Sequence, residues 1–393
     1  MRPVAETDRR SPEPGSQKKL IVFGYDAAEA AQIRRIRSYL ACHYQVQGFT
    51  MRRGNMNENF APFWPNIHLG NVRNASFRSR AGKLIAALPT IYRNRQLLDG
   101  ADAIVARNLD MLGLAAFAQM LTPNGRPMLI YECLDIHSMM TSQGLVGWLA
   151  RRLERLLLRQ CNLLIVSSPT FLTAYFEKEQ GWGGRSAVLE NKLWLEDDPP
   201  PPPRPKPSEV SRADGPIRLG WVGTLRCSWS LSILAEVARQ MGPDIDIRMH
   251  GVVHTHALPD FDEVLATHEN VSYAGPYNYP HDLADIYASC DVVWSQDLWQ
   301  WGTNSTWLLP NRIYEASYYG CPSIAVDGTE TSRRVSEGLG WVVPHPDAES
   351  LIACLNSISP SALDRARKSL LSRPEEDFRL TPHEVCTVID AAF

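Results

Sequence analysis

The sequence predicts an α/β protein made of two doubly wound domains, each a parallel sheet covered by helices on both faces. Three observations lead to this fold class. Short apolar runs alternate with stretches of helical spacing, as in parallel strands joined by crossover helices. The alternation stops at a proline-rich segment, residues 197–207, and then starts again. With 393 residues, the chain is also longer than a single hydrophobic core usually serves.

In the first half, the run 20–24 predicts a buried strand that ends at Gly24, and residues 27–40 follow with helical spacing. The same reasoning gives the other elements of this half. Further strands are expected at 44–49, 103–106, 128–131, 163–166 and 186–189, and helices at about 79–98, 110–121, 145–160 and 169–179.

The second half repeats the pattern after Gly215 and Pro216. Strands are expected at 217–222, 245–250, 292–294, 323–326 and 341–343, and helices at 229–241, 281–289, 311–319 and 347–357. Ligands of doubly wound sheets bind at the carboxyl ends of the strands, so two such domains predict a cleft lined by both.

These elements set the expected domain boundaries. The polar, proline- and serine-rich residues 1–17 predict a disordered tail. Two α/β domains are expected at 18–195 and 216–378, joined by a stiff proline-rich linker at 196–215. Residues 379–393 predict a C-terminal helix that can pack back on the N-terminal domain.

Charge is divided unevenly along the chain. Residues 1–195 carry 25 Lys and Arg against 15 Asp and Glu, whereas residues 196–393 carry 15 against 28. A basic half predicts an anionic partner such as a membrane surface, although uneven surface charge without a partner is the alternative. No run approaches the roughly 18 apolar residues of a membrane span, so a cytoplasmic location is expected, with peripheral association with the inner face of the plasma membrane as the variant that the basic half favours. No nucleic-acid partner is expected.

The most informative segment is Leu308–Ser323, LLPNRIYEASYYGCPS. Asn311 is a good helix N-cap, and Gly320 suits the helix end. The helix N-terminus at Asn311 and Arg312 suits a pyrophosphate, and Glu315 lies one turn into the helix. By itself Glu315 could equally be a solvated helix carboxylate.

This segment resembles the donor-binding signature of GT-B glycosyltransferases, particularly the family-4-like enzymes. The resemblance implies two Rossmann-like domains facing each other across a cleft, with Glu315 binding the donor ribose hydroxyls. Residues 220–226, GWVGTLR, look like the first strand and loop of the family's C-terminal domain. There Gly223 and Thr224 approach the phosphates, and Arg226 is the candidate to grip them, unless it is only a surface arginine after a tight turn.

The first half resembles bacterial exopolysaccharide glycosyltransferases of the succinoglycan type, over most of residues 19–378. The resemblance is carried by 105–110, 131–137, 167–169 and 190–192. It implies a nucleotide-sugar donor such as UDP-glucose, a polyprenyl-diphosphate-linked saccharide acceptor and no metal or other cofactor. The residues expected on the acceptor side are Gly24, Tyr25, Asp26, Arg107, Asn108 and Asp110.

One departure bears on the mechanism. Retaining family-4 enzymes carry a second Glu eight positions before the ribose-binding one, and here that position is Trp307. An inverting enzyme instead needs a general base for the acceptor hydroxyl. Asp135, just after a strand, matches the Asp of related inverting enzymes, with His137 as the second candidate. The alternative is that Asp135 only caps the next helix.

Other motifs are weaker. The sequence has no G-x-G-x-x-G, which argues against a nicotinamide cofactor, and His250, His254 and His256 lack a third ligand, so no metal site is expected. Of the tryptophans at 294, 299, 301 and 307, one is expected to contact a ligand.

Residues 148–159 form a basic amphipathic helix, for which packing against the sheet with arginines outward is favoured over membrane binding. Two rival functions stay open. One is a nucleotide-sugar 2-epimerase, which shares this architecture. The other is an inactive scaffold of a polysaccharide assembly complex.

Overall fold

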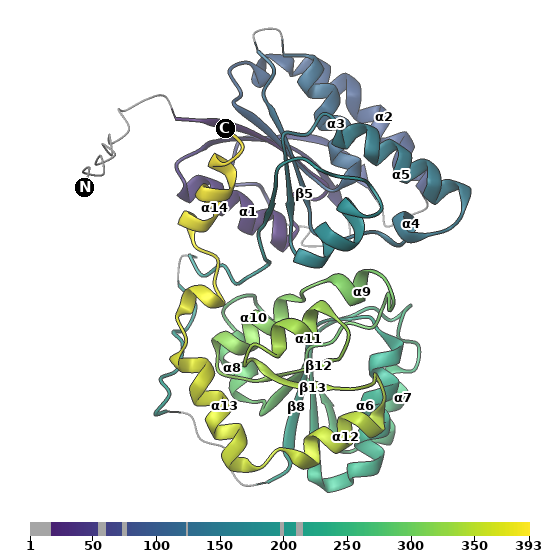
Figure 1. Ribbon diagram of the computed structural model, residues 1–393, viewed down its shortest axis with the longest axis vertical. Helices are drawn as coiled ribbons and strands as arrows, with labels where there is room; N and C mark the ends of the chain where they lie inside the picture. Colours follow the sequence, from purple (N-terminus) through teal and green to yellow (C-terminus); the bar gives the residue numbers. More distant parts are fainter. Residues whose placement is uncertain (1–16, 54–59, 73–76, 123–124, 197–199, 210–214) are drawn as a thin grey trace, which may run out of the picture. The chain divides into compact units, whose positions relative to one another are not determined.

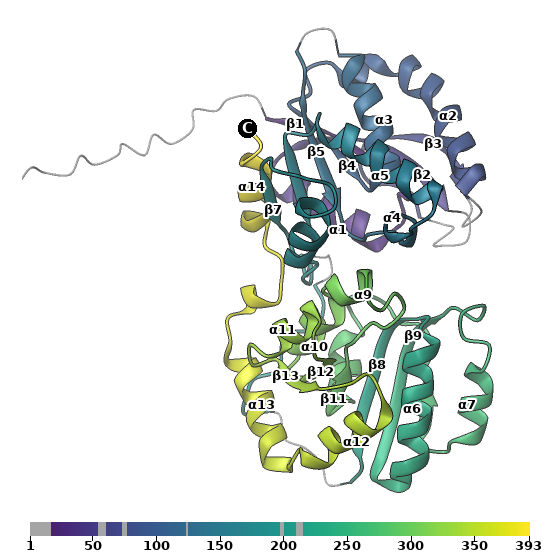
Figure 2. The ribbon, with the colours of Figure 1, turned by 45° about the vertical axis from the view of Figure 1, so that its right-hand side comes forward.

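The structure is a computed structural model that describes residues 17–53, 60–72, 77–122, 125–196, 200–209 and 215–393. It is a mixed α/β protein with two parallel sheets, which confirms the predicted fold class (Figures 1 and 2). The chain divides into two compact units: residues up to 106 together with 110–129, and residues 107–109 together with 130–393. The expected disordered tail lies almost wholly outside the described residues.

The first sheet has seven strands in the order β3-β2-β1-β4-β5-β6-β7. They are β1 (Lys19–Gly24), β2 (Gln45–Arg53), β3 (Asn66–Val72), β4 (Ala103–Arg107), β5 (Met128–Cys133), β6 (Leu163–Val166) and β7 (Ser186–Val188). The helical segments between them are α1 (Ala30–Ala41), α2 (Phe77–Arg93), η1 (Arg95–Leu98), α3 (Leu109–Met120), α4 (Ser138–Thr141), α5 (Leu145–Leu158) and the π-helix η2 (Phe171–Glu177). The sequence did not predict β3, an edge strand with two buried residues, or the four-residue α4.

The second sheet has six strands in the order β10-β9-β8-β11-β12-β13. They are β8 (Ile217–Leu225), β9 (Ile245–Val253), β10 (Val271–Tyr273), β11 (Val292–Trp294), β12 (Ser323–Val326) and β13 (Gly340–Val343). The first helical segments that follow are α6 (Ser228–Met241), η3 (Gly242–Asp244), α7 (Phe261–Thr267), α8 (Leu283–Ala288), α9 (Asn304–Trp307) and α10 (Asn311–Tyr318). The rest are α11 (Glu330–Val335), α12 (Ala348–Ser357), α13 (Pro360–Ser372), η4 (Glu375–Asp377) and α14 (Pro382–Asp390).

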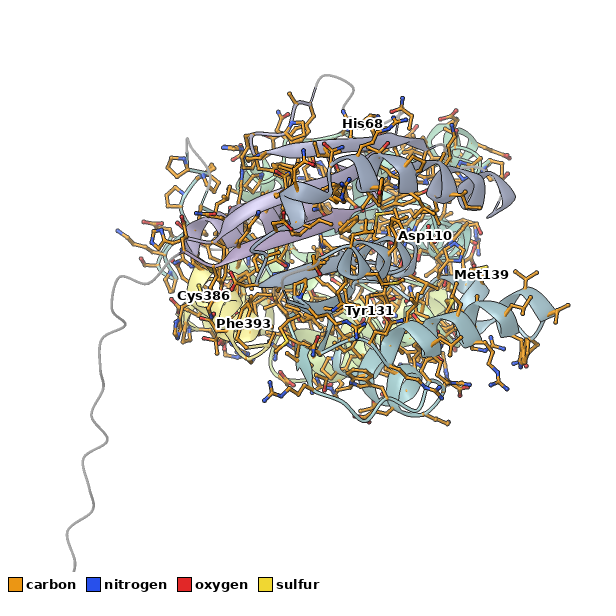
Figure 3. All side chains as sticks on the ribbon, turned by 90° about the horizontal axis from the view of Figure 1, so that it is seen from above. His68, Asp110, Tyr131, Met139, Cys386 and Phe393 are labelled. Atoms are coloured by element: carbon orange, nitrogen blue, oxygen red, sulfur yellow. The ribbon has the colours of Figure 1, made fainter. Side chains whose placement is uncertain are left out.

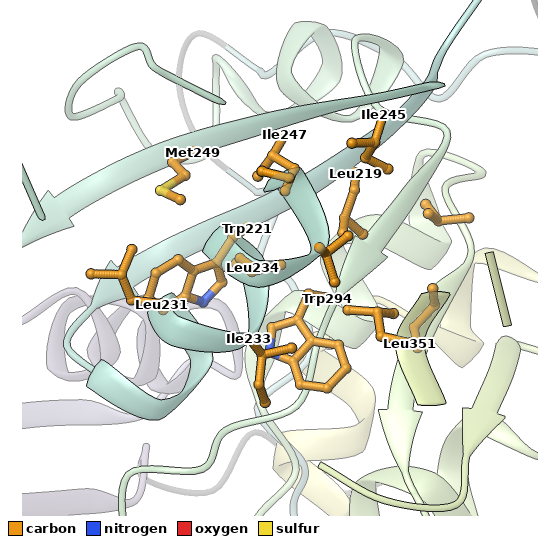
Figure 4. Close-up of a cluster of buried hydrophobic side chains, with 14 of the residues drawn as sticks. Leu219, Trp221, Leu231, Ile233, Leu234, Ile245, Ile247, Met249, Trp294 and Leu351 are labelled. Carbon is orange, nitrogen blue, oxygen red and sulfur yellow. The ribbon is translucent and has the colours of Figure 1, made fainter. Parts of the chain in front are cut away.

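Two hydrophobic clusters hold helices onto this second sheet. One contains Trp221 and Trp294, fully buried beside residues of α6 and α12 (Figure 4). The other contains Tyr287 of α8, Tyr314 of α10 and Leu370 of α13. The strands are therefore buried on both sides, which is why they read as continuous apolar runs in the sequence.

The described part of the proline-rich connector is fastened to the helices of the second sheet. The guanidinium of Arg204 donates to the backbone carbonyls of Tyr318, Leu370 and Arg373. It also lies over the rings of Tyr318 and Phe378, at 5.4 and 5.5 Å from their centroids. An arginine that satisfies three carbonyls fixes this stretch of the connector to the second unit.

The C-terminal segment returns to residues that precede the connector, within the second unit. Leu193 pairs with Arg379 in a parallel bridge, and Lys192 Nζ lies 3.2 Å from Glu384 of α14. Arg185 also donates to the carbonyl oxygen of Ala391, at 3.1 Å. The end of the chain is thus attached beside β7.

Candidate functional site

Helix α10 carries the motif on which the donor-site prediction depends. It begins at Asn311, and its N-cap is Pro310, whose backbone is extended and makes no side-chain cap bond. Asn311 is therefore the first helical residue and not the cap, a correction of one position. The helix ends at Tyr318, and Gly320 follows with φ of 75°, which confirms the expected C-terminal glycine.

Glu315 of α10 is buried, with 5% of its surface exposed. Its Oε2 accepts a hydrogen bond of 2.9 Å from the hydroxyl of Tyr287. Burial, and next the neighbouring Glu315, raise the pKa of Tyr287 well above its ordinary value, so the phenol stays protonated and donates. The solvated-carboxylate alternative is wrong, because Glu315 is held by a buried partner that the sequence did not reveal.

Arg312 lies just before the turn that carries Glu315. Its Nη1 is buried, and among the described residues it has no hydrogen-bond partner. Its Nη2 would lie 3.9 Å from a Cβ placed on Gly223, so the guanidinium sits beside that backbone. A buried charged donor without an acceptor is costly, and an anionic ligand at this point would satisfy it.

Two glycines face each other where β8 and β9 near their carboxyl ends. Gly223 pairs in register with Gly251, and both have positive φ, 113° and 130°. A Cβ on Gly251 would lie 1.7 Å from the carbonyl oxygen of Gly223, so only glycine fits there. Exposed Thr224 follows directly. The sequence reasoning missed Gly251, although a glycine just after the predicted strand 245–250 was a usable signal.

Arg226 follows β8 and forms an ion pair, and its phosphate-binding role stays a prediction. Its Nη2 lies 3.6 Å from Oδ2 of Asp297, and 36% of its side chain is exposed. The Asp297 carboxylate also accepts from the backbone N–H of Trp299 and the hydroxyl of Ser305. Arg226 is thus oriented by a fixed carboxylate while its guanidinium stays accessible to a ligand.

Asp135 follows β5, and it does not cap the next helix. The cap of α4 is His137, whose Nδ1 accepts from the backbone N–H of Met139 at 3.2 Å. The alternative reading of Asp135 as a helix cap is therefore wrong. In the same unit, buried Asn304 of α9 accepts from the N–H of Ile136 at 3.0 Å, which positions the backbone next to Asp135.

The environment of Asp135 changes its acidity. Its side chain remains reachable by solvent, yet the surrounding protein removes enough hydration that burial raises its pKa. Arg226 and a hydrogen bond with Asn304 oppose this rise, and Asp297 adds to it. A reachable carboxylate with a raised pKa is a stronger base when ionised, which is the property that general-base catalysis uses.

Three of the expected acceptor-side residues follow β1 in the first unit. Gly24 packs against the side chain of Gln32, and Tyr25 lies under the guanidinium of Arg53 at 5.7 Å. Asp26 is fully buried and forms an ion pair of 3.0 Å with Arg53. This geometry gives Asp26 a structural role in the first unit, and its acceptor contact stays a prediction.

The other expected acceptor-side residues lie around the end of β4. Arg107 is buried and forms an ion pair of 3.0 Å with buried Glu132, which gives it a structural role, and its acceptor contact stays a prediction. Asn108 adopts φ of 74°, and its N–H donates to the carbonyl of Glu132. Partly exposed Asp110 lies in the first turn of α3, in the first unit.

Helix α5 leaves much of its apolar surface exposed, which corrects the expectation that this surface would be packed against the sheet. Six apolar side chains are between 47% and 72% exposed: Leu145, Val146, Trp148, Leu149, Leu153 and Leu156. The side that faces the protein carries Leu157 and Leu158 together with Glu154, which accepts from the hydroxyls of Tyr131 and Tyr175 and the amide of Gln180. Figure 3 labels Tyr131 and Met139 in this part of the chain.

The tryptophans at 294, 299, 301 and 307 differ in how far they are exposed. Trp294 is fully buried and Trp307 partly buried, whereas Trp299 and Trp301 are 44% and 37% exposed. The rings of His254 and His256 lie 5.5 Å apart. In the described ranges, no group of three or more His, Cys, Asp or Glu could hold a metal ion.

Comparisons with known proteins extend this picture. No family model matches the chain. It is 34% identical over 344 residues to the succinoglycan biosynthesis protein ExoL of Rhizobium meliloti strain 1021, covering 87% of this chain and 85% of the relative. Among solved structures, sucrose-phosphate synthase of Thermosynechococcus elongatus has a TM-score of 0.68 at 13% identity, covering 95% of this chain and 98% of that one. HepE of Anabaena, solved in complex with UDP, has a TM-score of 0.62 at 15% identity with the same coverage.

Two parallel doubly wound sheets, the second with buried Glu315 on α10 and with Arg312 beside Gly223 of β8, give the chain the GT-B fold class of glycosyltransferases. Within that class, the chain belongs to the family of the succinoglycan biosynthesis protein ExoL. The resemblance to exopolysaccharide glycosyltransferases that the sequence indicated is thereby confirmed.

Proposed function

We propose that this protein transfers a hexose from a nucleotide-sugar donor, UDP-glucose as the first choice, to a polyprenyl-diphosphate-linked saccharide. The transfer inverts the anomeric centre and needs no metal ion. The observation that carries the donor site is the pair on α10, where buried Nη1 of Arg312 has no partner among the described residues and buried Glu315 follows three residues later on the same helix. Such a pair matches a diphosphate linked to a ribose. The guanidinium donates to the anionic diphosphate, and the carboxylate accepts from the two ribose hydroxyls.

In this proposal the donor diphosphate lies between the N-terminus of α10 and the glycine end of β8. Arg312 and Arg226 neutralise it, and the backbone at Gly223 and Thr224 approaches it closely. The same groups stabilise the charge that develops on the leaving nucleoside diphosphate, which is the work a metal ion performs in other enzymes. Glu315, fixed by Tyr287, accepts from the ribose hydroxyls.

The chemical step is a single displacement. Asp135 takes the proton of the acceptor hydroxyl while its oxygen bonds to the anomeric carbon of the donor sugar. The bond from that carbon to the diphosphate breaks, and the nucleoside diphosphate leaves with the electron pair. Trp307, in the place of the second family Glu, offers no carboxylate for a retaining route.

Thermal-shift binding tests the donor site. UDP, GDP, ADP and a nicotinamide dinucleotide are compared on the wild type and on Glu315→Ala. A diphosphate at about 100 times its Kd should stabilise the protein by about 2.7 kcal/mol, and the variant should lose this shift. If no diphosphate stabilises the wild type, the donor-site proposal fails. Binding without transfer would favour the scaffold, and an epimerised nucleotide sugar formed without acceptor would favour the 2-epimerase.

The charges around Asp135 predict opposite pH shifts in two variants. A base must be ionised, so kcat/KM falls as the pH drops through its pKa, which burial raises here. Arg226 lowers this pKa and Asp297 raises it. The acid limb of the kcat/KM profile should therefore move to higher pH in Arg226→Gln and to lower pH in Asp297→Asn. If the acid limbs of both variants move in the same direction, or neither moves, Asp135 is not the base.

We further propose that the exposed side of α5 binds an anionic membrane surface, where a lipid-linked acceptor would be met. Leucines spaced as Leu145, Leu149, Leu153 and Leu156 follow one side of the helix, and exposed Arg152 and Arg159 flank them. An interfacial helix combines these features, apolar burial with attraction to anionic headgroups. Within the described chain, no helix is long and apolar enough to cross a membrane.

Vesicle co-sedimentation tests the α5 surface. The wild type should bind vesicles of phosphatidylcholine with phosphatidylglycerol more tightly than phosphatidylcholine alone. Leu149→Glu with Leu153→Glu should weaken binding at least about tenfold, since each leucine loses roughly 1.5–3 kcal/mol of apolar burial. Val252→Glu, at a 54% exposed position on β9, is the matched control and should bind like the wild type. A wild type that ignores vesicles, or a dimer that the double variant dissociates in light scattering, would overturn this proposal.

A further inference from the structure

Three tryptophans of the second sheet's domain are left outside its core, and two of them touch. Trp229 opens α6 and is 40% exposed, and Trp299 and Trp301 lie in the loop between β11 and α9. The rings of Trp229 and Trp301 meet edge to face, with centroids 5.9 Å apart and planes at 72°. By contrast, Trp221 and Trp294 fill the core a few residues away (Figure 4). Large indole rings left exposed in a cluster commonly mark a binding surface.

The loop that presents these rings is held by polar bonds and not by burial of the tryptophans. The carboxylate of Asp297 accepts from the N–H of Trp299 at 2.9 Å. Farther along, the hydroxyl of Ser305 accepts from the N–H of Gln300 at 2.7 Å, and that of Thr306 from the N–H of Gly302 at 3.0 Å. These bonds fix the backbone on both sides of Trp301, so the ring is presented at little cost in conformational entropy on binding.

Two charged groups lie near the aromatic pair in the sequence. Arg226 precedes Trp229 by three residues, and its partner Asp297 lies four residues before Trp301 in the same loop. Both charges act on Asp135, the proposed base. A pyranose ring has a C–H face that stacks on an aromatic ring and hydroxyls at its rim that bond to charged groups. This combination of surfaces is the one that the cluster offers.

We infer that Trp229 and Trp301 form a saccharide-binding platform that stacks a pyranose of the acceptor, next to the sugar whose hydroxyl reacts. The identity of the acceptor in this inference rests on the proposed function. The binding of a saccharide to the two tryptophans is independent of the proposed function. The platform would favour an acceptor of more than one sugar, because a sugar whose hydroxyl meets Asp135 cannot also cover the two tryptophans.

Saturation-transfer NMR tests the platform, because it reports which ring protons lie against the protein. Cellotriose, maltotriose and lactose are the probes, each at millimolar concentration. At least one should receive saturation at its pyranose C–H protons from the wild type and lose it in Trp229→Ala/Trp301→Ala. The paired Phe variant should retain part of the signal. Trp148→Ala, which removes a 47% exposed tryptophan from α5, is the matched control and should behave like the wild type.

UDP thermal shift on the same variants separates this inference from the proposed function. The double alanine variant should keep the wild-type shift, since neither tryptophan is assigned to the nucleotide. Loss of both the saccharide signal and the UDP shift would overturn the platform, because the tryptophans would then support the donor site or the fold. No transfer to any probe from the wild type, or an undiminished signal in the double alanine variant, would overturn it too. A protein that binds saccharide but never UDP would sink only the proposed function.

Discussion

Replacing Arg312 with alanine should weaken UDP binding roughly 10- to 100-fold while leaving the fold intact, because a hydrogen bond to a charged group is worth about 1.5–3 kcal/mol. The side chain contributes little to the stability of the ligand-free protein, since its buried Nη1 has no partner in the described residues. Its removal should therefore cost little stability and much affinity. Isothermal titration calorimetry of the purified variant measures the change directly.

Two further variants sharpen this test. Arg312→Lys keeps the positive charge but loses the planar fork, so it should restore part of the affinity. Arg333→Ala is the matched control, because Arg333 lies on α11 in the same unit and pairs there with Glu330 and Glu337. If Arg312→Ala binds UDP as tightly as the control, the diphosphate does not lie at α10.

The sequence predicted the central strands but missed two of the four edge strands, β3 and β10, for a physical reason. Strands inside a parallel sheet are buried on both faces and appear as apolar runs, as in β1, where five of six residues are buried. At the sheet edges, β3 has two buried residues and β10 one, so no apolar run marks them. Helix α13 was missed although Ser359 and Pro360 form a usual helix start, and there the signal was present.

The candidate site was predictable where its residues are neighbours in the chain. The run from Pro310 to Gly320 specifies a helix start, a carboxylate and a glycine stop within a few turns. The partners that orient it were not predictable, because Tyr287 and Gly251 reach the site only through the packing of other elements. Sequence alone gives no rule for which distant tyrosine meets which glutamate.

The structural roles of charged residues at strand ends and on amphipathic helices could not be predicted from the sequence. Asp26 and Arg107 follow or end apolar strands, as ligand-binding residues do, yet both form buried ion pairs. On α5, the helical period was predicted correctly, but the exposure of its six apolar side chains was not. Glu154 is buried because two tyrosine hydroxyls and an amide satisfy it, a set of partners that no local pattern encodes.

Replacing Asp135 with asparagine should lower kcat for sugar transfer by about 10²- to 10⁴-fold, the usual contribution of a general base. The asparagine keeps the size of the side chain and can still meet Asn304, but it cannot take a proton. UDP affinity should stay close to that of the wild type, because the donor groups lie on β8 and α10. Transfer from UDP-glucose to a polyprenyl-diphosphate-linked saccharide, followed together with UDP titration, separates the two effects.

His137 provides the comparison that decides the identity of the base. Its Nδ1 is occupied as the cap of α4, so His137→Asn should preserve the cap and most of the activity. If instead His137→Asn lost transfer and Asp135→Asn kept it, the base would be the histidine, acting through its other nitrogen. Should both variants stay active, the acceptor hydroxyl must lose its proton elsewhere. The raised pKa of Asp135 would then reflect only its crowded surroundings.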